Sequence, residues 1–131
     1  MCSSSPVICG SLLAIAIVTG CSHKSASDSV PEVGKIELQD LWEMYSTHAA
    51  KSGRPPAGPD DLKAEQRGSP LGGRALRDPN FVIVYGTPVG GSSVLAYHKD
   101  VPAQGGLVLL SDGSIKTLSA SEFQAAPKAG K

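Results

Sequence analysis

Residues 36–52 read IELQDLWEMYSTHAAKS, a stretch in which apolar side chains recur at intervals of three and four residues. That spacing gathers the apolar side chains on one stripe of a helix. Acidic residues come early in the stretch and Lys51 comes late, which suits the helix dipole. Gly53, followed by Arg54-Pro55-Pro56, supplies a stop. We therefore predict an amphipathic helix over Ile36–Ser52, with an apolar stripe of Leu38, Leu41, Trp42, Tyr45 and Ala49 opposite Glu37, Asp40, Glu43 and Thr47.

The two aromatic residues of this stripe, Trp42 and Tyr45, allow two interpretations. They could form a binding face, but aromatic side chains at helical spacing inside an apolar stripe more often belong to a hydrophobic core. We favour the core, so the helix needs another layer of structure to cover its stripe.

The last third of the chain supplies that layer, because four short runs there have the composition of β-strands. The run Leu107–Leu110 is continuously apolar and is therefore predicted to be a central strand. The predicted fold class is α+β, with one amphipathic helix packed on a small antiparallel sheet. The four predicted strands are Phe81–Tyr85, Ser93–His98, Leu107–Leu110 and Ile115–Leu118.

Local signals predict the connection between the last two strands and the element that comes after them. Asp112-Gly113 is the pair that a two-residue hairpin turn favours, because both central residues of that turn need positive φ. Ser119 and Glu122, placed just before Phe123, match a capping box that opens a short C-terminal helix.

The connection between the long helix and the strands is rich in proline and glycine. We predict a short helix over Pro59–Glu65, with aspartates at its positive end, and a loop over Gly68–Asn80. Gly72-Gly73 lies in this loop without the neighbouring residues that a phosphate-binding motif requires, so a plain loop is the better interpretation.

The start of the chain has the features of a secretory signal. The apolar run Ile8–Thr19 has the length of a signal's apolar region and is shorter than the roughly 20 residues that span a bilayer. Val18-Thr19-Gly20-Cys21 resembles the lipobox of bacterial lipoproteins, in which an aliphatic residue and two small residues precede a cysteine. The resemblance implies cleavage before Cys21 and two or three acyl chains, such as palmitate, on that cysteine. A cleaved soluble signal and an uncleaved short anchor are the alternatives.

The segment after Cys21 is small and polar and has no apolar period, which is typical of a flexible tether. The predicted organisation is a signal peptide at 1–20, a tether at 21–34, a single α+β domain at 35–126 and a disordered tail at 127–131.

Charge and cysteine content argue against several kinds of partner and site. All charged residues follow Gly20, and 12 basic residues balance 12 acidic ones. Without a basic excess, nucleic acid is not an expected partner. Cys2 and Cys9 fall inside the predicted signal, so the mature domain has no thiol for a disulfide or a metal. No cofactor and no metal is predicted.

Two stretches in the C-terminal part resemble a known element. They are VLAYHKD at residues 94–100 and GGLVLLSDGSIKTL at residues 105–118. Together they resemble the end of prepilin-like proteins of planctomycete-type bacteria, where a histidine precedes an apolar strand that ends in Asp-Gly. The order of lipobox, tether, helix, hairpin and Ser-x-x-Glu-Phe tail also resembles a set of small lipoproteins from such bacteria. These resemblances imply a pilin-like helix and sheet, and they imply no particular activity.

Few residues are candidates for a functional site. His98, Asp100 and Asp112 are a grouping of histidine and carboxylates, but Asp112 already has a structural role in the predicted turn. We therefore predict no catalytic residue. Loops held by a sheet often carry binding sites, so His98, Lys99, Asp100 and Gln104 are a candidate contact loop, with an ordinary connector as the alternative.

These features favour a lipid-anchored protein of the bacterial membrane that faces the periplasm or the cell surface. We expect a non-catalytic structural or protein-interaction module, not an enzyme, with envelope proteins as candidate partners. The alternative is an accessory component of a pilus-like or secretion assembly. A third hypothesis is an enzyme or metal-dependent binder that uses His98 and Asp112.

Overall fold

The computed structural model describes residues 32–129, so the predicted signal, Cys21 and most of the predicted tether lie outside the described residues. The sheet consists of β1 (Phe81–Ile83), β2 (Val94–His98), β3 (Gly106–Leu110) and β4 (Ile115–Leu118). The α-helices are α1 (Glu32–Ser52), α2 (Pro70–Arg77), α3 (Val101–Gln104) and α4 (Ala120–Ala125), and two 3-10 helices are η2 (Pro59–Leu62) and η3 (Glu65–Arg67).

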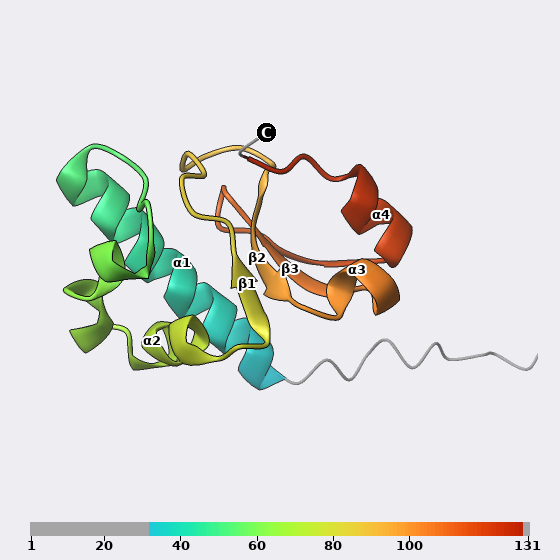
Figure 1. Ribbon diagram of the computed structural model, residues 1–131, viewed down its shortest axis with the longest axis horizontal. Coiled ribbons are helices and arrows are strands. Elements are labelled where there is room, and N and C mark those ends of the chain that lie inside the picture. Colours follow the sequence, from blue (N-terminus) through green and yellow to red (C-terminus); the bar gives the residue numbers. More distant parts are fainter. Residues whose placement is uncertain (1–31, 130–131) are drawn as a thin grey trace, which may run out of the picture.

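The four strands form one antiparallel sheet in the order β1-β2-β3-β4. Figure 1 shows α1 and α2 on one side of this sheet and α3 and α4 on the other. The predicted α+β class and four-stranded antiparallel sheet are confirmed, with helices on both faces rather than one. Among the described helices, none has the length and apolarity needed to cross a membrane.

α1 supplies half of the buried residues of the core on its side of the sheet. Leu38, Leu41, Met44 and Tyr45 are almost completely buried, and burying side chains of this size contributes about 1.5–3 kcal/mol each. The Tyr45 hydroxyl donates a hydrogen bond of 3.0 Å to the carbonyl oxygen of Thr87, and burial raises the pKa of Tyr45. Leu38, Leu41 and Tyr45 of the predicted stripe therefore lie in the core, and Trp42 packs against it half-buried. Met44, which the stripe did not include, is also buried there, whereas Ala49 is not part of this core.

The boundaries of several elements differ from those predicted. α1 begins at Glu32, so residues predicted to end the tether form its first turn. β1 ends at Ile83, before Tyr85, and the helix predicted over Pro59–Glu65 is the 3-10 helix η2 followed by a separate η3. The predicted central position of Leu107–Leu110 is confirmed, because β3 pairs with strands on both sides.

The prediction of a loop over Gly68–Asn80 is wrong, because this segment contains α2, which packs tightly on α1. A Cβ atom at Gly72 would lie 2.9 Å from the backbone nitrogen of Leu41 and 3.0 Å from the carbonyl oxygen of Asp40. The Gly72 N–H donates a 2.7 Å hydrogen bond to the Asp40 carboxylate. The N-cap residue Ser69 makes no side-chain hydrogen bond to the start of α2. The Asp40 carboxylate of α1 therefore caps α2 in its place. Glycine pairs disfavour helices, and this contact overrides that preference.

The polar side of α1 therefore faces α2 and not only solvent. Besides Asp40, Glu37 is 8% exposed, and its Oε1 lies 3.6 Å from Nε of Arg74. These two carboxylates were predicted simply to lie opposite the apolar stripe.

A β-bulge in β2 determines which of its side chains face which helices. Its register with β3 places two residues, Leu95 and Ala96, opposite the single residue Leu109. Both Leu95 and Ala96 pack in the core with α1, although consecutive strand residues normally face opposite sides. After the bulge the alternation is shifted by one, so Tyr97 packs against α4 and His98 lies on the α1 side.

The other face of the sheet is covered by α3 and α4. The rings of Tyr97 and Phe123 lie 4.6 Å apart, and Val101 is fully buried in the same cluster. The predicted capping box is present, because Ser119 Oγ accepts the Glu122 N–H and the Glu122 carboxylate accepts the Ser119 N–H. That hydrogen bond from the Ser119 backbone lowers the pKa of Glu122.

The prediction of a disordered tail from Pro127 is wrong for its first two residues. The Val94 N–H donates a 2.8 Å hydrogen bond to the Pro127 carbonyl, and Lys128 forms a bridge beside Val94. The Lys128 ammonium donates to the Phe123 carbonyl at 2.9 Å and lies 4.6 Å from the centre of that ring. The domain therefore continues past residue 126.

The hairpin between β3 and β4 has a three-residue loop, not the predicted two-residue turn. The Gly113 N–H donates to the Leu110 carbonyl, and the Leu110 N–H donates to the Ser114 carbonyl. This pattern leaves Ser111–Gly113 in the loop with Gly113 at φ 87°, where glycine is favoured. A Cβ at Gly113 would also lie 2.5 Å from Nε1 of the half-buried Trp42. Gly113 is required both by its φ and by the indole that covers it.

We expect Gly72→Ala to lower the free energy of unfolding by about 1–3 kcal/mol, because the new methyl group would collide with main-chain atoms of α1 that cannot rotate away. Gly73→Ala is the matched control in the same helix, since its Cβ would lie 3.4 Å from the flexible side chain of Gln66. The control should be neutral or stabilising. Urea unfolding followed by circular dichroism measures both, and equal effects would contradict the close approach of α1 and α2.

Candidate functional site

A cavity of about 390 Å³ lies at the end of the domain where α1 begins. The start of α1, the start of β1, the end of β2 and the segment from α3 to β3 line it. Its apolar side chains are Leu38, Phe81, Val101 and Leu107. The remaining lining residues are the glycines Gly34, Gly105 and Gly106 and the polar residues His98, Asp100 and Gln104.

His98 reaches this cavity because of the bulge in β2. With uninterrupted alternation from the buried Val94, it would share the face that packs on α3 and α4. The shift places it on the α1 side, paired across the strands with Phe81. The two rings meet edge to face, with centroids 5.9 Å apart and planes at 82°. The imidazole therefore forms part of the cavity wall.

The polar rim consists of a half-exposed pair. His98 Nδ1 lies 3.2 Å from Asp100 Oδ2, and the two side chains are 42% and 51% exposed. Asp100 is the N-cap residue of α3, a position where aspartate usually accepts a backbone N–H, yet its side chain makes no such bond. The carboxylate is directed to the rim instead of to the helix.

Glycines shape the cavity in two ways. Gly105 has φ 77°, and a Cβ there would lie 2.6 Å from the Leu118 carbonyl oxygen, so its backbone is pressed against the end of β4. At Gly34, in contrast, a Cβ would meet no atom within 4 Å. A side chain at position 34 therefore has room, at a residue that lines the cavity.

The structure brings together three of the four residues predicted as a contact loop. His98, Asp100 and Gln104 line the cavity, while Lys99 is exposed and does not. The loop also contains the short helix α3. Sequence reasoning missed Gly34, Leu38 and Phe81, which come from distant segments and carry no local signal of a site.

The grouping of His98 with Asp112 is wrong. Tyr97 pairs with Val108 and the hairpin loop follows Leu110, so Asp112 lies at the opposite end of β3 from His98. The Asp112 carboxylate accepts hydrogen bonds from the Ser114 hydroxyl and backbone N–H, at 2.6 and 2.9 Å. These bonds lower the pKa of Asp112 and fix the hairpin loop, as expected for a structural role.

A second cavity, of about 330 Å³, lies at the other end of α1. Val89, one of its lining residues, is 43% exposed. Its other walls come from the last turns of α1 and from the adjoining turn, including Arg54 and Pro55.

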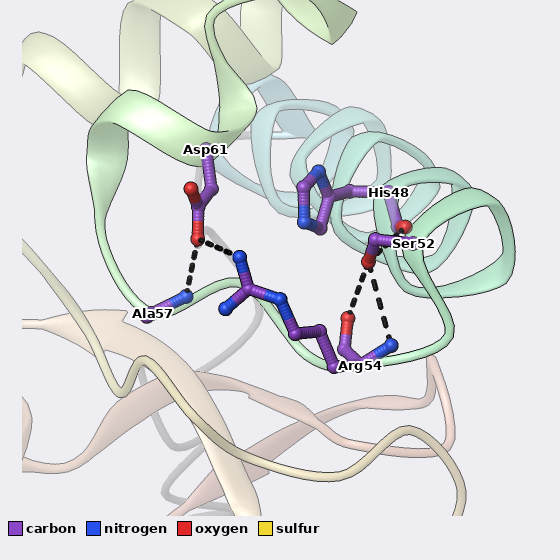
Figure 2. A network of polar contacts seen from close by, with 5 residues as sticks. All are labelled: His48, Ser52, Arg54, Ala57 and Asp61. Atoms are coloured by element: carbon purple, nitrogen blue, oxygen red, sulfur yellow. Dashed lines mark hydrogen bonds and ion pairs between the residues drawn. The ribbon is translucent and has the colours of Figure 1, made fainter.

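The polar contacts beside this second cavity close a turn (Figure 2). Ser52 Oγ lies 2.9 Å from the His48 carbonyl oxygen and 2.8 Å from that of Arg54. The Asp61 carboxylate accepts the Ala57 N–H at 2.9 Å and lies 3.9 Å from the Arg54 guanidinium. These contacts hold the end of α1 and η2 together, and we assign them a structural role.

Within residues 32–129, no group of three or more His, Cys, Asp and Glu side chains is placed to hold a metal ion. The cavity at His98 therefore stands as the candidate site on its shape, its apolar lining and its polar rim. Comparison of the chain with protein-family models, with curated proteins and with solved structures found no match.

Proposed function

We propose that this chain is a lipid-anchored, non-catalytic interaction module of the bacterial envelope, and that it makes contact through the end of the domain that holds the His98 cavity. The observation that carries the proposal is the convergence of His98, Asp100 and Gln104 on an apolar cavity. Concave, mostly apolar sites with a few placed polar groups are typical binding sites.

The chemistry of the lining supports binding rather than catalysis. Among the described residues that line the cavity there is no serine, threonine, cysteine or lysine. Thus no hydroxyl, thiol or amine nucleophile stands beside His98 there. The half-exposed His98 and Asp100 can orient a partner without forming a nucleophile and base pair.

The position of the cavity suits an anchored module. Cys21 precedes the start of α1 by eleven residues, and an extended chain of that length reaches at most about 40 Å. Gly34, in the first turn of α1, lines the cavity. A lipid at Cys21 would keep this end of the domain near the membrane surface, within reach of other envelope proteins.

The anchor is tested by Cys21→Ser in the full chain expressed in a bacterial envelope. We expect the unaltered protein to sediment with membranes, with mass spectrometry showing acylation at Cys21 and loss of residues 1–20. The variant should appear in the soluble fraction. An unmodified, intact N-terminus on membrane-bound protein would contradict the anchor.

The contact surface is tested in the same membranes with a photo-cross-linking residue in place of Gln104. The control is Gln39, an exposed glutamine on α1 that does not line the cavity. We expect a defined protein adduct from position 104 and none from position 39. Pilus or secretion components in stoichiometric adducts would favour the assembly hypothesis, and equal labelling from both positions would refute the proposed contact end.

A further inference from the structure

We infer that the His98 cavity binds a small organic ammonium ion, whose short apolar body fills the cavity and whose cationic head lies at Asp100. The inference rests on the proposed function for the location of the binding end, and it adds the chemical class of the ligand.

The size and lining of the cavity favour a short apolar body. A volume of about 390 Å³ lies at the small end of the range for small-molecule sites, which is roughly 300–1,000 Å³. Leu38, Phe81, Val101 and Leu107 supply apolar walls. Because Gly34, Gly105 and Gly106 add no side chain, part of the lining is bare backbone against which a ligand can lie closely.

The charge of the rim favours a cation. Asp100 provides the only carboxylate among the described lining residues, and none of them is lysine or arginine. Its side chain does not cap α3 and is 51% exposed, with Oδ2 3.2 Å from His98 Nδ1. An ammonium group at the mouth can therefore approach this carboxylate, whereas an anionic group would be repelled by it.

The rim is half exposed to solvent. The charge of Asp100 should therefore decide which ligands are preferred, while it contributes only a small part of their affinity. Exposed ion pairs in water are weak. We expect an ammonium ligand to bind about three- to fivefold more tightly than a neutral ligand of the same shape, which corresponds to the upper part of the range for such pairs. An anionic ligand of the same length should bind least.

The test uses three matched probes, hexylammonium, 1-hexanol and hexanoate, titrated at pH 8 into the purified full-length chain. Amide shifts in two-dimensional NMR spectra report binding at Gly105 and Gly106, which line the cavity. We expect saturable shifts there, with dissociation constants rising in the order ammonium, alcohol, carboxylate. Asp100→Asn should abolish the preference for ammonium over alcohol and leave alcohol binding unchanged.

Filling the cavity is the second arm of the test. A side chain at position 34 has open space and glycine is a poor helix residue, so Gly34→Leu should fold and should weaken all three probes about tenfold or more. Gln39→Leu, at an exposed position on the same helix, is the matched control and should bind like the original chain.

Unchanged binding in Gly34→Leu, equal binding of hexanoate and hexylammonium, or no shift with any probe would overturn the inference. The proposed function is judged separately. If cross-linking from Gln104 succeeds while the probes fail, the contact end remains and the ligand class is wrong. If the probes bind in the predicted order while Gln104 yields no adduct, the ligand site remains and the protein-interaction role is wrong.

Discussion

The bulge at Leu95–Ala96 is the constraint on which the two cores and the candidate site depend. In a strand without the bulge, successive side chains would alternate strictly between the two faces of the sheet. Every residue from Ala96 onward would then lie on the opposite face from the one it occupies. With it, two consecutive apolar side chains pack under α1, and the ring of Tyr97 is available to Phe123 on the opposite face. His98 then stands at the open end of the α1 layer instead of beneath α4. One extra residue in β2 thus determines which side chains lie on each face of the sheet and where the His98 imidazole lies.

α1 joins the other parts of the domain by close contact on three sides. Its apolar stripe packs on the sheet, its polar side meets the backbone of α2 at Gly72, and Trp42 covers Gly113 at the far hairpin. Each of the two glycines sits where a side chain would strike α1, and in one case the partner atoms belong to the main chain. The first turn of the same helix contributes Gly34 to the cavity. The helix that builds the core therefore also positions the candidate site.

Much of the fold could be predicted from local sequence because its signals are local. The helical spacing over 36–52, the strand runs and the capping box at Ser119 each depend on residues a few positions apart. α2 could not be predicted, since Gly72 is unfavourable in a helix until the backbone of α1 lies against it. The bulge was equally hidden, because the sequence around Leu95 reads as an ordinary strand. Only those residues of the site that lie close together in the sequence, His98, Asp100 and Gln104, could be predicted. The residues that α1 and β1 contribute to the cavity wall become apparent only in the tertiary structure.

The most direct test of this account is a set of nuclear Overhauser effects that report which way the side chains after the bulge point. With the bulge present, we expect contacts between the rings of Tyr97 and Phe123, whose centres lie 4.6 Å apart, and between those of His98 and Phe81. We also expect contacts from both Leu95 and Ala96 to side chains of α1. Contacts from Tyr97 to α1 and from His98 to Phe123 would mean that β2 runs without a bulge, and they would remove His98 from the cavity.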